Sequence, residues 1–416
     1  MAPTRYVIAG GSAAGIAAAQ AIRELDSHGL ITVLSAEDDP PYYRPLIPFV
    51  IDGRKTADEI ALLGQGPYTA QDIVVRLESA VTSVDPEAHT VSVAGGAEPV
   101  EYDKLLIATG SRPYVPPSIQ GSDAAGVYAL RTMADARSMA ERVNVTQNAI
   151  MAGGGMLNLK ATFALLERGV SVTLVVTSPE VLSQVMEPDG AALIRDALER
   201  AGLRILTGRS ITQIIAGLDG LTGVLLDSGE ELDCELVCIG KGVRPNVEFL
   251  AGSDIHVDEG VVADTHTACS APDVYTAGDV AVTFDPITGE RMMTALWTNA
   301  VEMGRCAGRN MAGRPTAYGG TFGILNATQV AEVPFVSMGI VHTAGTDYET
   351  HVFQPDGVYR KLVFAPDGER LVGAVFVGDI AHAGLYRHLI RERVRLEDLK
   401  PVVLEHRLHY GHMLRL

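Results

Sequence analysis

The chain has 416 residues, of which 47% are hydrophobic and 20% are charged, and it contains 43 glycines and 21 prolines. A chain of this length is too long for one ordinary hydrophobic core, so we expect two or three globular domains. Its formal net charge of −18 argues against a nucleic acid as principal partner, because a nucleic-acid binder needs a basic face that displaces counterions.

The N-terminus leads directly into a strand-like pattern, RYVIAG, without a cationic segment followed by a long apolar core. Neither a signal peptide nor a run of about 20 uninterrupted apolar residues is evident in the sequence. We therefore expect a cytoplasmic protein that does not associate with a membrane.

The first predicted unit lies in residues 5–26, RYVIAGGSAAGIAAAQAIRELD, where a strand-like stretch, a turn of small residues and a helix-forming segment follow one another. Such a turn lets backbone N–H groups and the positive end of the helix dipole face a pyrophosphate, while small side chains leave room for it. A second strand, LITVLSAE, delivers Glu37, where an acid could hold a ribose hydroxyl. The pattern predicts a dinucleotide-binding unit; a glycine-rich strand-to-helix turn without a nucleotide stays open as the alternative.

A second glycine loop occupies residues 152–162, AGGGMLNLKAT, between an apolar run that ends NAIM and the helical pattern KATFALLERG. The loop keeps a pyrophosphate seat in Gly153, Gly154 and Gly155. Asn158 takes the third glycine position, and Val176 ends the next apolar run, where an acid would grip the ribose. Losing that acid removes one charge-assisted hydrogen bond, about 1.5–3 kcal/mol. Glu180 comes a little later but lies beyond an intervening Ser-Pro pair. Because the three glycines remain while the ribose acid is missing, we expect weakened but retained nucleotide binding.

The four cysteines, Cys234, Cys238, Cys269 and Cys306, form no C-x-x-C pair, so the sequence predicts neither a redox dithiol nor a zinc ribbon. Cys234 and Cys238 are four residues apart in the strand-like run ELDCELVCIG, which places both on one face of the expected strand. We interpret them as small buried apolar residues rather than ligands.

Three further stretches are YDKLLIATGSRP (102–113), VYTAGDVA (274–281) and ALWTNAVEMGRCAGRNMAG (295–313). They resemble the ATG and GD signatures of the two-dinucleotide-domain flavoproteins, the broad family that contains glutathione reductase, rubredoxin reductase and putidaredoxin reductase. The resemblance runs in order over essentially the whole chain. It implies an α/β fold class with two Rossmann-like domains and a C-terminal α+β interface domain.

The family architecture implies a discontinuous FAD-binding domain in residues 1–113 and 241–322, with an NAD(P)-binding-like domain inserted in residues 114–240. Residues 323–416 would form the interface domain. This tail contains alternating strands in GVYRKLVFAPDGERLVGAVFVGD, with a turn at PDGE, followed by a helical segment, AGLYRHLIRERV. Such a domain often makes a dimer or partner interface, so we expect an oligomer or a hetero-complex.

The resemblance also assigns site residues. The GD aspartate, Asp279, would hold the ribityl chain of FAD, and the helix after LWTN would stabilise negative charge on the reduced flavin. Arg44, beside Tyr43, is a candidate charge partner for a phosphate or the reduced flavin, and a surface arginine in a proline-rich loop stays open. The expected FAD contacts are Gly10, Ser12, Ala13, Ala14, Gly15, Glu37, Arg44, Pro45, Ala108, Thr109, Gly110, Gly278, Asp279, Trp297, Thr298, Asn299 and Ala300.

Disulfide reductases and thiol peroxidases of this fold carry redox cysteines beside the flavin, whereas the corresponding region here, DPPYYRPLIPFVIDGR, has none. A flavin accepts a hydride from a nicotinamide and releases electrons one at a time. We therefore expect FAD and NAD as cofactors and an iron–sulfur protein or subunit as partner, since the chain has no cluster-binding cysteine run of its own. Two alternatives stay open: an NAD-independent electron-transfer or structural flavoprotein subunit, and a stand-alone NADH oxidase.

Lys160 stands where NADH-using relatives carry a glutamate near the nicotinamide. Reversing that charge would favour anionic reduced flavin and raise its potential, which makes Lys160 a candidate catalytic residue. Arg44, the candidate charge partner of the reduced flavin, is the second. The pattern G-G-G-x-x-x-x-K-A resembles a branch of FAD oxidoreductases that accompany iron–sulfur enzymes; a helix lysine reaching solvent stays open. We expect NAD rather than NADP, because no basic residues follow the second strand of this unit.

Two features of the tail are weaker candidates. The segment RHLIRERVRLEDLK (387–400) could be a basic docking patch or an ordinary solvated helix face, and its cations are Arg387, Arg391, Arg393, Arg395 and Lys400. The histidines at 406, 409 and 412 are spaced by three, but no acid or cysteine completes a metal-binding pattern, so we expect no metal. The sequence does not indicate the ultimate substrate, the direction of electron flow or the oligomeric state.

Overall fold

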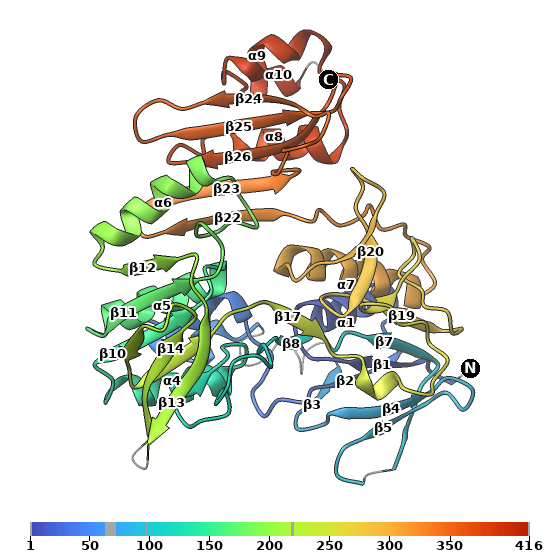
Figure 1. Cartoon of the computed structure of the whole chain (residues 1–416). Coiled ribbons are helices and arrows are strands. Elements are labelled where there is room, and N and C mark those ends of the chain that lie inside the picture. The colour runs from blue at the N-terminus through green and yellow to red at the C-terminus, as the bar shows by residue number, and fades with distance from the viewer. Residues whose placement is uncertain (1, 63–71, 97, 218–219, 415–416) are drawn as a thin grey trace. The chain divides into compact units, whose positions relative to one another are not determined.

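The computed structural model in Figure 1 describes all of the chain except residues 1, 63–71, 97, 218–219 and 415–416. The chain forms two compact units. The first contains Met1–Tyr114, Arg131–Ala136 and Val243–Thr321, and the second contains Val115–Leu130, Arg137–Gly242 and Phe322–Leu416. The predicted α/β fold class is confirmed, while the three-domain division stays a prediction.

The first unit is built on a parallel sheet in the strand order β19-β7-β1-β2-β3. Its strands are β1 (Arg5–Ala9), β2 (Leu30–Leu34), β3 (Ile73–Arg76), β7 (Lys104–Ile107) and β19 (Val274–Thr276). Helices α1 (Ala13–Leu25) and α7 (Trp297–Met311) lie side by side against this sheet (Figure 1). Apolar side chains of the sheet and of both helices form one buried cluster, so the glycine turn between β1 and α1 is held on a rigid core.

Smaller elements complete the first unit. Three small sheets contain β4 (Val81–Asp85), β5 (Thr90–Val93) and β6 (Val100–Glu101); β8 (Ser111–Pro113) and β17 (Val243–Pro245); and β18 (Val261–Val262), β20 (Ala281–Phe284) and β21 (Arg291–Met293). The short helical turns are η1 (Arg44–Leu46), α2 (Pro48–Ile51), η2 (Asp58–Ile60) and η3 (Glu248–Leu250).

The second unit repeats the plan with a parallel sheet in the order β12-β11-β10-β16-β9. Its strands are β9 (Val127–Tyr128), β10 (Asn148–Ala152), β11 (Ser171–Val176), β12 (Arg204–Thr207) and β16 (Leu236–Ile239). The helices are α4 (Met133–Val143), which begins in residues of the first unit, α5 (Met156–Glu167) and α6 (Pro188–Arg200). An antiparallel meander of β13 (Ile211–Gly217), β14 (Gly220–Leu226) and β15 (Glu231–Asp233) shares a buried cluster with the sheet.

The run ELDCELVCIG is not one strand. Glu231–Asp233 pair in the antiparallel meander, whereas Leu236–Ile239 pair in the parallel sheet. The predicted burial of Cys234 and Cys238 is confirmed, at 0% and 1% exposure. The expectation that they share one face of one strand is wrong, because the chain changes sheets between them.

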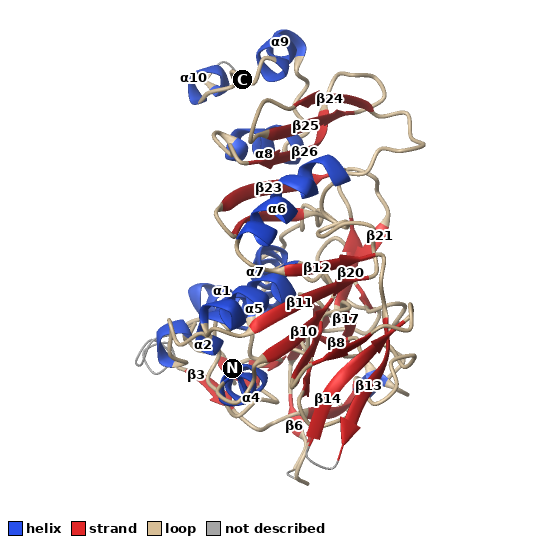
Figure 2. Ribbon diagram, turned by 60° about the vertical axis from the view of Figure 1, so that its left-hand side comes forward, coloured by secondary structure: helices blue, strands red, loops and turns tan. Residues whose placement is uncertain are grey.

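The tail forms an antiparallel sheet in the order β22-β23-β26-β25-β24. Its elements are β22 (Leu325–Val330), β23 (Val333–Gly339), β24 (Glu349–Phe353), β25 (Tyr359–Phe364), β26 (Leu371–Val377), α8 (Ala383–Arg391), η4 (Glu397–Leu399), α9 (Lys400–Leu404) and α10 (Tyr410–Met413). Helix α8 packs on β26, as Figure 2 shows, and α6 contacts β23, β25 and β26. Every residue of β25 and β26 is therefore buried. Among the described residues, no helix is long and apolar enough to cross a membrane.

Candidate functional site

The first glycine turn is shaped by close backbone approach. Gly10 has a φ of +122°, and a Cβ there would stand 2.0 Å from the carbonyl oxygen of Ala108. A Cβ on Gly15 would stand 1.9 Å from the carbonyl oxygen of Gly10. Both positions therefore require glycine. The first N–H groups of an α-helix have no intrahelical acceptor, and the side chain of Ser12, the N-cap of α1, makes no capping hydrogen bond to them.

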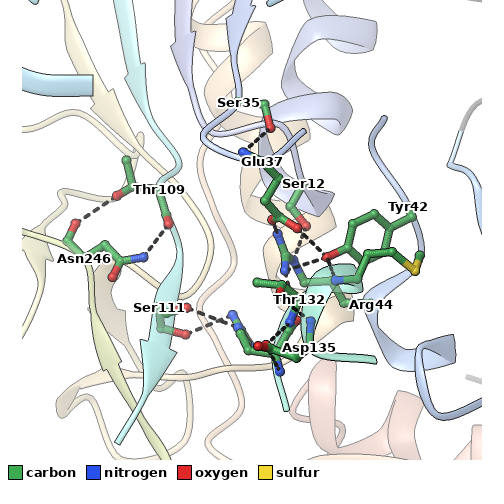
Figure 3. Close-up of polar contacts among 12 residues, drawn as sticks. Ser12, Ser35, Glu37, Tyr42, Arg44, Thr109, Ser111, Thr132, Asp135 and Asn246 are labelled. Carbon is green, nitrogen blue, oxygen red and sulfur yellow. Dashed lines mark hydrogen bonds and ion pairs between the residues drawn. The ribbon is translucent and has the colours of Figure 1, made fainter. Parts of the chain in front are cut away.

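Arg44 lies beside this turn and joins four groups, as Figure 3 shows. Its Nε donates to Ser12 Oγ at 3.1 Å, and its Nη1 donates to the Tyr42 hydroxyl at 3.1 Å and to the Arg131 carbonyl oxygen at 3.0 Å. Its Nη2 forms an ion pair with Glu37. The Arg44 side chain is 21% exposed, so it is a fixed part of the turn's surroundings rather than a free surface arginine.

Glu37 follows β2, at the edge of the sheet where the glycine turn lies. Its Oε2 accepts from the Tyr42 hydroxyl at 2.6 Å, and its N–H donates to Ser35 Oγ at 3.3 Å. The Tyr42 hydroxyl in turn accepts from the Met133 N–H at 2.9 Å. The carboxylate that the sequence predicts as a ribose ligand is therefore held in a fixed orientation beside the turn.

Asp279 follows Gly278, which has a φ of +83°. Its Oδ2 accepts from Ser111 Oγ at 3.0 Å and from Arg131 Nη2 at 2.6 Å. Arg131 was not predicted as a site residue. The capping box T-M-A-D at 132–135 could have predicted the helix start, but no sequence pattern pairs Arg131 with an aspartate far along the chain.

The ATG segment is fixed by a second residue that the sequence analysis missed. Asn246 Nδ2 donates to the Thr109 carbonyl oxygen at 2.9 Å, and Thr109 Oγ1 donates to the Asn246 carbonyl oxygen at 2.9 Å (Figure 3). The Asn246 N–H also donates to the carbonyl oxygen of Gly110, which has a φ of +65°. These bonds set the backbone path at the end of β7.

Helix α7 begins at Trp297, and its N-cap, Leu296, offers no side-chain acceptor. The Trp297 ring lies 5.6 Å from the Tyr43 ring, centroid to centroid, with an interplanar angle of 37°. Thr298 is exposed, whereas Asn299 and Ala300 are buried. The N–H groups at this helix start are thus without a side-chain cap, as expected for a helix end that faces a ligand.

The second glycine loop keeps its backbone geometry. Gly153 has a φ of +114°, and a Cβ there would stand 2.1 Å from the Gly240 carbonyl oxygen, whereas a Cβ on Gly155 would meet nothing within 4 Å. Asn158 is buried and donates from Nδ2 to the Gly153 carbonyl oxygen at 2.6 Å. Its side chain therefore supports the loop in place of the expected third glycine.

Neither residue considered at the ribose position of this second loop offers a free acceptor. Val176 is 3% exposed and packs against Gly154. Glu180 is also buried: its Oε2 pairs with Arg195 at 2.5 Å, and its Oε1 accepts from the Val181 N–H at 3.0 Å. Both oxygens of Glu180 are therefore engaged.

Lys160 lies in the first half of α5, half-buried. Burial lowers the pKa of its ammonium group. Within the described part of the chain, Lys160 forms no ion pair. Lys160 is thus a desolvated cation on the helix that follows the second glycine loop.

None of the four cysteines is suited to be a nucleophile. All are free thiols. Burial raises the pKa of Cys234 to about 12 and that of Cys306 to about 11, and it also raises the pKa of Cys269. A thiol reacts as its thiolate, which these shifts disfavour at neutral pH.

The structure gives little support to the two candidate sites of the tail, the basic segment at 387–400 and the histidines at 406, 409 and 412. Arg395 pairs with Glu369 at 2.7 Å and Lys400 with Glu349 at 2.9 Å, which neutralises part of the basic segment. His409 caps α10, and the His406 ring packs against the His351 ring. Among the described residues, no group of three or more potential metal ligands is present.

The comparisons with known proteins agree with this geometry. The model of the pyridine nucleotide-disulphide oxidoreductase family matches residues 4–304. The NADH-dependent phenylglyoxylate dehydrogenase subunit epsilon of Aromatoleum evansii is 30% identical over 400 residues, which cover 95% of this chain and 94% of that protein. The rubredoxin-NAD(+) reductase of Ectopseudomonas oleovorans is 29% identical over 311 residues, 74% of this chain and 80% of that protein. The solved structure of an NAD-dependent persulfide reductase from A. fulgidus superimposes with a TM-score of 0.88 at 25% identity, covering 95% of this chain and 78% of that one.

Proposed function

This chain belongs to the pyridine nucleotide-disulphide oxidoreductase family, as the sequence resemblance predicted, and we propose that it carries electrons between NAD(H) and an iron–sulfur protein or subunit. It is an FAD-dependent NAD(P)H oxidoreductase, its cofactors are FAD and NAD, and its chemistry is NAD(H)-linked electron transfer. The partner and the roles of individual residues belong to the proposal.

The residues of the first unit fit FAD. The turn at Gly10 and Gly15 follows a tight backbone path that only glycine permits, and the uncapped start of α1 offers N–H donors to a pyrophosphate. Arg44 adds a cation beside this turn. The Glu37 carboxylate, bonded to Arg44 and Tyr42 but 22% exposed, keeps free lone pairs that would accept from the adenine ribose. Asp279 would hold the ribityl chain, oriented by Ser111 and Arg131, and the start of α7 would face the flavin ring.

The observation that carries the proposal is that this flavin seat has no thiol. Residues 39–54 contain no cysteine, and burial raises the pKa of Cys234, Cys269 and Cys306, which disfavours their thiolates. Bound FAD takes two electrons from a nicotinamide and releases them singly. Without a dithiol to receive an electron pair, a one-electron carrier is the matching acceptor, and its cluster must belong to another protein.

The names of two relatives support the proposal of a separate electron carrier. One is a subunit of an NADH-dependent dehydrogenase, and it matches this chain over nearly its full length. The other is a reductase that links rubredoxin to NAD+. We propose by analogy that this chain also works with a separate electron carrier, as a complex subunit or a direct partner.

The test mixes the FAD-loaded protein with NADH in the absence of oxygen, first alone and then with a [2Fe–2S] ferredoxin. We expect NADH to bleach the flavin absorption and ferredoxin to restore it while becoming reduced. Failure to bleach at about millimolar nucleotide, the upper end of ordinary substrate use, would refute the role of NADH and favour an NAD-independent flavoprotein subunit. Reoxidation by oxygen alone, with peroxide as product, would instead identify an NADH oxidase.

A matched variant separates the two nucleotide seats. In Gly153→Ala the new Cβ would collide with the Gly240 carbonyl oxygen, which distorts the second loop, and both residues belong to the second unit. We expect this variant to retain FAD and to lose reduction by NADH. Loss of FAD together with reduction would show that the two loops do not serve separate nucleotides.

Lys160 is proposed to stabilise negative charge on the reduced flavin. We expect Lys160→Glu to lower the reduction potential of the bound flavin and to slow its reduction by NADH, with Lys160→Gln between the two. Redox titration and stopped-flow absorbance measure both quantities. A potential and a rate equal to those of the unmodified protein would remove this role and leave a solvent-reaching helix lysine.

A further inference from the structure

Two loops of the second unit are tied together beyond the carboxyl end of β11. The Arg209 N–H donates to the Val176 carbonyl oxygen at 3.2 Å, and the Gly208 N–H donates to the Ser178 carbonyl oxygen at 3.1 Å. The loop after β12 therefore runs alongside the loop after β11. Arg209 thereby adds an exposed guanidinium group to a strand end that has no basic residue in its own sequence.

A third loop, after β16, reaches the same place. Lys241 Nζ donates to Thr177 Oγ1 at 2.6 Å, and Thr177 Oγ1 lies 3.1 Å from Ser210 Oγ. We call Thr177, Arg209, Ser210 and Lys241 the edge cluster. Its two cations and two hydroxyls come from three separate strand ends, so only the fold brings them together.

The edge cluster lacks a negative partner. Among the described residues, neither Lys241 nor Arg209 forms an ion pair, and Lys241 is half-buried, which lowers the pKa of its ammonium group. Of the acids nearby, Glu180 is already engaged by Arg195 and by a backbone N–H. Asp227, whose N–H donates to the Ser210 carbonyl oxygen at 2.9 Å, forms no ion pair with either cation in the described part of the chain. A desolvated cation without a counter-charge is unfavourable, and an anionic ligand group would remove that penalty.

The position of the cluster indicates which anion fits. In a dinucleotide-binding unit the pyrophosphate lies at the start of the helix after the first strand, here the loop of Gly153 to Gly155. The residues at the end of the second strand select between NAD and NADP: an acid there holds the 2′-hydroxyl of the adenosine ribose, whereas a cation accommodates a 2′-phosphate. Here that strand is β11, and the edge cluster brings two cations from other loops, together with two hydroxyls, to its carboxyl end.

We propose that the edge cluster is a 2′-phosphate subsite, so that this chain uses NADP(H) as well as NAD(H). The inference deepens the proposed function, on which it rests, by naming a second nicotinamide substrate for the same seat. It departs from the sequence-based preference for NAD, which relied on the lack of basic residues directly after the second strand. The two cations come instead from the loops after β12 and β16.

The test uses two probes that differ only in the 2′-phosphate, adenosine 2′,5′-bisphosphate and 5′-AMP. Titration calorimetry on the FAD-loaded protein should show the bisphosphate binding about tenfold to 100-fold more tightly, the gain of one charge-assisted hydrogen bond. Equal or weaker binding of the bisphosphate, or no binding of either probe, overturns the subsite. Inorganic phosphate that binds as tightly as the bisphosphate would show a free phosphate site instead, and would also overturn it.

Three variants assign the effect to the cluster. Lys241→Gln and Arg209→Gln should each reduce the bisphosphate preference by about tenfold, the loss of one charged contact. Arg204→Gln is the matched control, because Arg204 begins β12 at the opposite end of the sheet and pairs there with Glu230. A preference unchanged in both Lys241→Gln and Arg209→Gln overturns the proposal. Arg209 is exposed, so its variant decides the question even if Lys241→Gln fails to fold.

Flavin reduction separates this proposal from the proposed function. We expect NADPH to bleach the flavin in the absence of oxygen, and Lys241→Gln to impair reduction by NADPH more than reduction by NADH. Bleaching by NADH alone would overturn the 2′-phosphate subsite and leave the proposed function standing. Bleaching by neither nucleotide would overturn the proposed function, while the bisphosphate titration would still decide the subsite.

Discussion

Asn158 is a buried helix residue that fastens the second glycine loop. Its Nδ2 donates to the Gly153 carbonyl oxygen, and a Cβ on Gly240 would stand 2.8 Å from its Cγ. We predict that Asn158→Gly, which restores the glycine fingerprint, lowers the free energy of unfolding by about 1–3 kcal/mol. The variant loses a buried hydrogen bond and places a glycine inside a helix. Urea denaturation measures the change.

The companion variant Asn158→Ala removes the hydrogen bond but keeps a good helix former, so it should cost less stability than the glycine variant. Neither variant should bind NAD more tightly. Tighter binding by Asn158→Gly would show that the asparagine obstructs the nucleotide rather than supporting its loop.

Arg131 and Asp279 form a shielded ion pair, with side chains 20% and 13% exposed. We predict that Arg131→Met weakens FAD retention by about tenfold or more, because it leaves the carboxylate proposed to hold the ribityl chain without its cation. Arg112→Met is the matched control, since Arg112 and Glu248 are 48% and 66% exposed and such pairs are worth about 0–1 kcal/mol. Reconstitution of the apoprotein with FAD measures both, and equal losses would contradict the prediction.

At the residue scale, the sequence could predict residue types at the turns but not the contacts that they make. The roles of Gly10 and Gly15 in a tight turn could be predicted because the strand, the turn and the helix are contiguous in sequence. The Arg131–Asp279 contact joins residues 148 positions apart, and no local pattern encodes it. Glu180 shows the converse, since its sequence position left open a role at the ribose that its contact with Arg195 takes away.

Helices α1 and α7 pack with their backbones in contact. A Cβ on Gly304 would stand 2.2 Å from the Ala14 carbonyl oxygen, and a Cβ on Gly308 would stand 2.4 Å from that of Ala18. We predict that Gly304→Ala lowers the free energy of unfolding by about 1–3 kcal/mol through overpacking. It should also weaken FAD binding, because both helices begin at the proposed flavin seat. Denaturation and FAD titration measure the two effects.

A glycine-to-alanine substitution in α8 should have the opposite effect on the free energy of unfolding. Gly384 lies in α8, where an added Cβ would meet nothing within 4 Å. Gly384→Ala should therefore raise the free energy of unfolding by about 0.5–1 kcal/mol, because alanine loses less backbone entropy in a helix. If Gly304→Ala were as harmless as Gly384→Ala, close packing of α1 on α7 would not contribute to the seat.

At the element scale, periodicity and turn residues predicted both strand–turn–helix units and the hairpin of β25 and β26. They failed at ELDCELVCIG, where an apolar run is divided between two sheets. The division depends on the partners of each half, antiparallel β14 for Glu231–Asp233 and parallel β10 for Leu236–Ile239. A pattern of side chains on one strand does not identify the neighbouring strand.

At the scale of the whole molecule, ordered motifs predicted the family and fold class, whereas tertiary contacts decided the grouping of segments. Residues 131–136 belong to the first unit although the segments on both sides belong to the second. Helix α6 packs on the tail sheet, where the buried Lys361 donates to Glu187 at 2.5 Å and to Thr343 Oγ1 at 2.9 Å. Such contacts between distant segments leave no local signature in the sequence.

The tail sheet also gives the molecule an acid-sensitive element at His406. The ring packs against Phe353 and His351, and neither ring nitrogen has a hydrogen-bond partner among the described residues. Burial, followed by Arg360 and His351, lowers the pKa of His406 to about 4. The unfolded chain therefore binds the proton more readily, so this contribution to stability is complete above about pH 6.5 and is lost as pH falls toward 4.

We predict that the free energy of unfolding falls by on the order of 1–2 kcal/mol between pH 7 and pH 5 through this one group, less than for a fully buried ring. Urea denaturation followed by circular dichroism at the two pH values measures it. His406→Asn, which suits the left-handed backbone at this position, should shrink the difference, whereas the exposed His388→Asn on α8 should not. An equal fall in all three proteins would locate the acid sensitivity elsewhere, in carboxylates that lose their ion pairs.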